Sequence, residues 1–93
     1  MHDAQGGVNK IHPTALIDSA AELDGSVTVG PYAVIGAGVH IGAGARLKHC
    51  IIDKNVVVPD WHRIGFDREE DARRYTVTES GVVVVEKGRN IGR

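Results

Sequence analysis

Aliphatic side chains recur every six residues along the first two thirds of the chain. A helix would place apolar residues three and four apart, and a simple strand would alternate apolar with polar residues. A six-residue period instead fits a short strand followed by a tight corner, repeated three times in each coil. The pattern therefore predicts a parallel β-helix of three coils over residues 11–64, made of hexapeptide repeats. The aliphatic positions are Ile11, Ile17, Leu23, Val29, Ile35, Ile41, Leu47, then, after one five-residue step, Ile52, Val58 and Ile64.

Stacking of the coils would align the outward side chains in columns. Stacked strands lie about 4.8 Å apart, so equivalent residues of successive coils stand above one another. The five-residue step is best placed at the Lys48-His49 corner, which leaves Cys50 inward as core filler and Ile51 outward. The predicted columns are Leu16, Val34 and Ile51; Glu22, His40 and Val57; and Thr28, Arg46 and Arg63.

The first of these columns is a continuous aliphatic stripe. Exposed apolar stripes usually mark an interface. We therefore predict that Leu16, Val34 and Ile51 form an oligomer interface, and a three-sided prism favours a homotrimer. The alternative is that the C-terminal segment of the same chain covers the stripe.

The segments on either side of the repeats lack the six-residue period. Residues 1–10 are polar and are predicted to be a flexible tail. Residues 65–93 are predicted to cap the last coil within the same single domain, since a solenoid needs its open edges covered. In this cap we expect one or two helical turns over residues 68–74, followed by strands at 75–78 and 82–85.

Composition excludes several classes of function. The net charge of −1 argues against nucleic acid or a membrane surface as a partner. Aromatic residues make up only 4% of the chain, while glycine occurs 12 times, as suits a narrow prism filled with small side chains. Cys50 is the single cysteine, so no intrachain disulfide can form, and a cytoplasmic location is expected.

Two stretches resemble known families. Residues 11–46, beginning IHPTA and continuing to VGPYAVIG, resemble the first coils of UDP-N-acetylglucosamine O-acyltransferase. Residues 47–87, with EEDARRY and GVVVV, resemble the C-terminal end of bacterial glucose-1-phosphate adenylyltransferase. Both resemblances imply an all-β, left-handed parallel β-helix. Because they meet near Leu47, the chain resembles a chimera, a reduced form or a designed solenoid.

The resemblances imply no complete active site in this stretch. The acyltransferase family forms trimers and uses a histidine base from later coils, which no histidine of residues 11–46 matches. The adenylyltransferase family does its chemistry in a separate domain. We therefore predict a structural, self-associating β-helix module that needs no cofactor. One alternative is a fragment or minimal form of a hexapeptide acyl- or nucleotidyl-transferase.

Another alternative is a binding module for a phosphorylated metabolite, with Arg73, Arg74 and Lys87 as the anion-binding residues. The acidic residues just before the two arginines would otherwise pair with them locally. These acidic residues are Asp67, Glu69, Glu70 and Asp71.

The five histidines do not converge in the predicted columns, so we predict no metal site. Three copies of His12 or His49 around a threefold axis remain an alternative.

Overall fold

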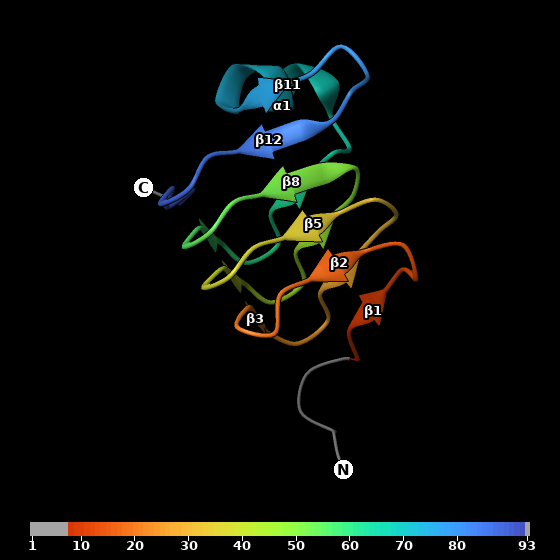
Figure 1. Cartoon of the computed structure of the whole chain (residues 1–93), viewed down its shortest axis with the longest axis vertical. Helices are drawn as coiled ribbons and strands as arrows, with labels where there is room; N and C mark the ends of the chain where they lie inside the picture. Colours follow the sequence, from red (N-terminus) through yellow and green to blue (C-terminus); the bar gives the residue numbers. More distant parts are fainter. Residues whose placement is uncertain (1–7, 93) are drawn as a thin grey trace.

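The computed structural model describes residues 8–92 as a three-sided parallel β-solenoid with a cap at its C-terminal end. Figure 1 shows β2, β5, β8 and β12 stacked along the long axis of the molecule. The predicted hexapeptide β-helix is confirmed, and its first strand begins at Lys10. Residues 1–7 of the predicted tail lie outside the described residues. The coil strands are β1 Lys10–Ile11, β2 Leu16–Ile17, β3 Glu22–Leu23, β4 Thr28–Val29, β5 Val34–Ile35, β6 His40–Ile41, β7 Arg46–Leu47, β8 Cys50–Ile52, β9 Val57–Val58 and β10 Arg63–Ile64.

These strands form three sheets, one on each side of the prism. Within residues 8–92 the four-stranded sheet has the order β1-β4-β7-β10, and the three-stranded sheet has the order β3-β6-β9. The five-stranded sheet has the order β11-β12-β8-β5-β2 and includes both strands of the cap. Every pairing between coils is parallel, as a solenoid requires.

The shortened corner falls where the period predicted it. Leu16 pairs with Val34, and Val34 pairs with Ile51, one residue earlier than a full repeat would give. Cys50 is fully buried, while Ile51 stays 41% exposed. His49 completes this corner with a φ of 51°.

The corners need backbone conformations that glycine adopts most easily. Gly38 and Gly44 both have a φ of 72°, and Asn55 and Trp61 occupy the equivalent corners one coil later. A Cβ on Gly44 would collide with the Trp61 ring. The Gly-Ala-Gly runs at 36–38 and 42–44 are therefore part of the corners.

The core consists of aliphatic side chains that point inward from all three sheets. Ile35, Ile41, Leu47 and Ile52 are at most 1% exposed. In the first coil Ile11 is 51% exposed, so the described core is densest in the second and third coils.

A helix and a hairpin cap the last coil. The helix α1, Arg68–Arg74, is followed by β11, Thr76–Val77, and β12, Val83–Val85. β11 pairs antiparallel with β12, and β12 adds in parallel to β8, which confirms the predicted strand cap. No helix within residues 8–92 is long and apolar enough to cross a membrane.

The segment after β12, which carried no sequence signal, extends a second side of the prism. Val57 donates its amide to the Arg89 carbonyl at 2.8 Å, and Ile91 donates to the Val57 carbonyl at 3.0 Å. The Ile91 side chain is buried. The cap therefore covers the open edges of two sheets.

Candidate functional site

The predicted aliphatic stripe lies in register on the five-stranded sheet. Leu16, Val34 and Ile51 are 67%, 37% and 41% exposed. Val84 pairs with Ile51 and adds a fourth, partly buried member, which the sequence columns missed. The alternation within the run 82–85 could have indicated it. Because β12 continues the sheet beside β8, the described part of the chain leaves the column uncovered. We call these four residues the aliphatic column.

The three-stranded sheet carries a charged column instead. His40 Nδ1 lies 3.6 Å from Glu22 Oε1, and His40 Nε2 lies 3.2 Å from Asp24 Oδ1. The Glu22–His40 contact was expected from the stacking, whereas Asp24 reaches His40 from the neighbouring corner. All three side chains are substantially exposed, so these pairs contribute only about 0–1 kcal/mol to stability.

The two predicted anion-binding arginines share one carboxylate. Arg73 Nη2 donates to Glu70 Oε1 at 2.6 Å, and Arg74 Nε donates to Glu70 Oε2. These hydrogen bonds lower the pKa of Glu70, and the bond from Arg74 has the largest effect. Lys87 lies exposed in the turn after β12, and within residues 8–92 it forms no hydrogen bond or ion pair with these residues. The structure therefore brings Arg73 and Arg74 together and leaves Lys87 apart.

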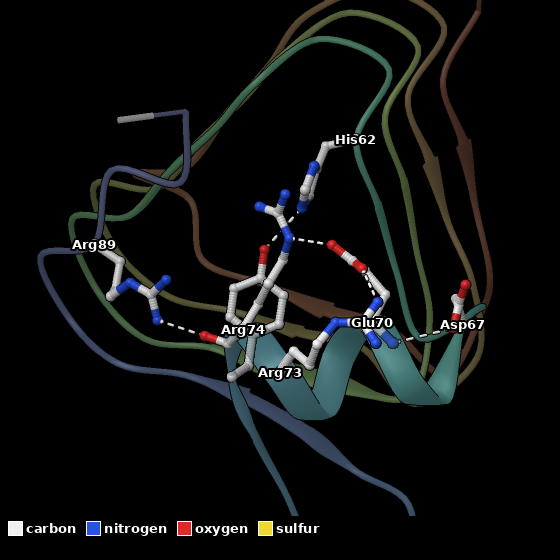
Figure 2. A network of polar contacts seen from close by, with 7 residues as sticks. His62, Asp67, Glu70, Arg73, Arg74 and Arg89 are labelled. Carbon is white, nitrogen blue, oxygen red and sulfur yellow. Dashed lines mark hydrogen bonds and ion pairs between the residues drawn. The ribbon is translucent and has the colours of Figure 1, made fainter.

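Arg89, which the sequence did not indicate, joins the cluster at the end of α1. Figure 2 shows it reaching the Arg74 backbone carbonyl, to which its Nη1 donates at 3.1 Å. Its guanidinium also lies 5.2 Å from the centroid of the Tyr75 ring. A cation at the C-terminal end of a helix stabilises the unpaired carbonyls there. The geometry thus explains Arg89 as a contact that holds the cap together.

Two of the acidic residues expected in ion pairs have other roles. Asp67 caps α1, because its Oδ1 accepts from the Glu70 amide at 3.1 Å. Asp71 is buried, and its Oδ2 accepts from the Gly65 amide at 2.9 Å. Burial raises the pKa of Asp71. The prediction of local ion pairs is correct for Glu70 and wrong for Asp67 and Asp71. Asp67 instead accepts a hydrogen bond at the start of the helix, and Asp71 accepts one from the turn at Gly65.

Burial in the third coil shifts the pKa values of two side chains, His62 and Cys50. His62 Nε2 lies 2.7 Å from the Tyr75 hydroxyl. Burial and then the charge of Arg74 lower the pKa of His62. Burial and, to a smaller extent, the charge of Asp71 raise the pKa of the Cys50 thiol to about 12. Such a thiol is almost entirely protonated at neutral pH and is a poor nucleophile.

The histidines of the described chain remain apart. His12 contacts Thr14, His49 packs edge-on against Tyr32, and His40 and His62 have the partners given above. Residues 8–92 contain no group of three or more histidine, cysteine or acidic side chains that could hold a metal ion. Three copies of His12 or His49 around an axis would require an assembly.

Comparison with known proteins identifies the repeats. The family model described as GlmU-like, C-terminal hexapeptide matches residues 9–85. Glucose-1-phosphate adenylyltransferase of Corynebacterium diphtheriae is 46% identical over 72 residues, 77% of this chain and 15% of that protein. Its counterpart in Geobacter metallireducens is 54% identical over 48 residues, 50% of this chain and 12% of that protein. Acyl-(acyl-carrier-protein)–UDP-N-acetylglucosamine O-acyltransferase of a Psychrobacter species is 40% identical over 63 residues, 67% of this chain and 22% of that protein.

The extent of these matches bears on the expected chimeric or designed origin of the chain. The chain spans only 12% to 22% of the length of these relatives. The family match and the first of these relatives each extend across Leu47. A change of family in mid-chain is therefore not required to explain the sequence, and the chimeric or designed origin stays a hypothesis.

Proposed function

Since the chain belongs to the GlmU-like, C-terminal hexapeptide family, we propose that it is a self-associating β-helix module of a transferase-type protein. The observation that carries this proposal is the aliphatic column, whose members stand in register and remain exposed. We further propose that the module forms a homotrimer in the cytoplasm. The single, buried cysteine supports a reducing compartment.

A second copy of the same chain suits the column because of its regular spacing. The members repeat at about 4.8 Å along the coil axis, and the column contains no charged side chain. Three parallel copies around a threefold axis would bring three identical columns together with their spacing matched. Closed rotational symmetry of this kind is the usual form of a homo-oligomer.

The size of the column predicts a weak assembly. Complete burial of a Leu, Val or Ile side chain contributes about 1.5–3 kcal/mol, and roughly half of that remains for side chains already partly covered. Loss of translational and rotational freedom costs about 4–15 kcal/mol for each association. The isolated module should therefore associate in a concentration-dependent manner.

Two charge substitutions on different sheets test the proposal. We expect Val34→Glu to give a monomer in sedimentation velocity, because a carboxylate would be buried among three aliphatic columns. Arg46→Glu lies on the four-stranded sheet and should assemble as the unmodified chain does. If Arg46→Glu lost assembly and Val34→Glu did not, the interface would lie on the four-stranded sheet, and the proposal would be contradicted.

A second candidate function is transferase chemistry in a cleft between copies. The names of the relatives, an adenylyltransferase and an O-acyltransferase, support it. Turnover of a sugar nucleotide or sugar phosphate by the purified chain, lost in Val34→Glu, would favour this candidate. Turnover that is absent at concentrations where the chain is assembled would leave the module with a role in assembly alone.

A further inference from the structure

A small pocket lies where the hairpin of the cap, the helix α1 and the short corner at His49 meet. Its volume is about 250 Å³. Pockets for drug-sized ligands measure about 300–1,000 Å³, so this one suits a smaller molecule. The polar side chains that line it are His49, Arg68, Asp71 and Ser80. All of its walls come from one chain, so the pocket does not depend on the proposed assembly.

Asp71 is the buried acidic group of this pocket and is only 2% exposed. Its Oδ2 accepts from the Gly65 amide, whereas its Oδ1 has no hydrogen-bond or ion-pair partner within residues 8–92. Burial raises the pKa of this carboxyl, and the charges of Asp67 and Glu70 act in the same direction, although the Gly65 bond opposes them. A buried carboxylate without a paired cation is costly. A positively charged group on a ligand would offset that cost.

Arg68 lines the same pocket from a position three residues before Asp71 on α1. Side chains three apart on a helix lie on the same face, with their Cβ atoms about 5–6 Å apart. Even so, these two form no ion pair in the described part of the chain, whereas Arg73 and Arg74 on the same helix both bind Glu70. The pocket therefore presents a carboxylate and a guanidinium that are close together but not paired.

We propose that this pocket binds a small zwitterion, namely an α-amino acid with a short aliphatic side chain. In this arrangement the ammonium group of the ligand donates to Asp71 Oδ1. The carboxylate of the ligand accepts from Arg68, because a guanidinium matches the geometry of a carboxylate. The aliphatic side chain packs on Val77 and Val83, which form the apolar part of the wall. Such a ligand pairs with both charges of the pocket at once, which neither an amine nor an acid alone can do.

The Gly65 and Gly81 amides report on the pocket, because both residues line it. In ¹H–¹⁵N NMR spectra, titration with L-valine should shift both resonances saturably, while Gly38, in a corner of the second coil, should not respond. Isobutylamine lacks the carboxylate of valine and isovalerate lacks its ammonium group, so each should bind at least about tenfold more weakly. Absence of a saturable shift at tens of millimolar valine would overturn the site. Isovalerate binding as tight as that of valine would overturn the role of Asp71, and the same result for isobutylamine would overturn that of Arg68.

Removal of single charges separates a specific site from general attraction. Asp71→Asn keeps an acceptor for the Gly65 amide and should weaken valine binding by about tenfold or more. Glu69→Gln removes the same charge from an exposed position of α1 outside the pocket, and it should change the affinity by no more than about twofold at moderate salt. Circular dichroism would verify that both variants are folded. Equal losses in the two variants would overturn the proposal. Val34→Glu should bind valine as the unmodified chain does, so failure of the assembly proposal would leave this result unchanged.

Discussion

The Gly65 amide donates a hydrogen bond to the buried carboxylate of Asp71 at 2.9 Å. This bond connects the turn that leaves the last coil strand to the helix of the cap. Gly65 has a φ of 93°, and any Cβ there would collide with the Lys48 carbonyl oxygen. The cap is therefore attached to the coil at a point where Gly65 leaves no room for a side chain and Asp71 supplies the hydrogen-bond acceptor.

Substitution of Asp71 should separate the hydrogen bond from the charge. Asp71→Ala leaves the Gly65 amide without its acceptor and should lower the free energy of unfolding by about 1–3 kcal/mol. Asp71→Asn keeps an acceptor and removes a carboxylate whose pKa is raised by burial, so it should stay within about 1 kcal/mol of the unmodified chain. Urea denaturation at neutral pH measures both. Equal losses in the two variants would show that the charge, not the hydrogen bond, matters.

The pH dependence of Asp71 has a definite sign. Because its folded pKa lies above the usual value of 3.8, the folded state holds this proton more tightly than the unfolded chain. Its contribution to stability is therefore present below pH 3.8 and is lost as the pH rises through the folded pKa. In Asp71→Asn this loss should be absent from the acid side of the stability profile.

His62 should act in the opposite direction at higher pH. Its folded pKa lies below the usual value of 6.5, so the unfolded chain binds the proton first on acidification. The free energy of unfolding should fall as the pH drops from 6.5 toward the folded pKa. His62→Gln, which can still hydrogen-bond the Tyr75 hydroxyl, should show a smaller fall in the melting temperature over this range. An unchanged slope in the variant would contradict the assignment to His62.

The Cys50 thiol should be unreactive in the folded chain. It is fully buried, and a pKa of about 12 leaves a thiolate fraction near pH 8 of about one in ten thousand. A disulfide reagent should therefore label Cys50 only when urea unfolds the chain. Lys87→Cys supplies an exposed thiol as a control and should react at once in the folded state. Rapid labelling of Cys50 without denaturant would mean that the core of the third coil opens readily.

The parts of the fold that repeat could be predicted from the sequence. The six-residue period gave the strands, and its single interruption placed the short corner at Lys48-His49, with Cys50 inward and Ile51 outward. Each of these features depends on one local pattern used again in every coil. The column of Leu16, Val34 and Ile51 followed from the same pattern.

The parts that occur once could be predicted only in outline. The helix and strands of the cap were expected, but the pairing of Val84 with Ile51 and the contact of Arg89 with Arg74 join segments far apart in the chain. No repeat specifies such contacts. The burial of Asp71 was missed for the same reason, since its surrounding charges resemble a solvated helix face.

If the aliphatic column makes this chain self-associate, the mass of the particle in solution should depend on protein concentration. Light scattering coupled to size exclusion, over a wide range of loading concentrations, measures this mass. We expect a mass that rises with concentration toward about three times the 9.9 kDa of one chain. A mass that stays at that of one chain at every concentration would contradict it.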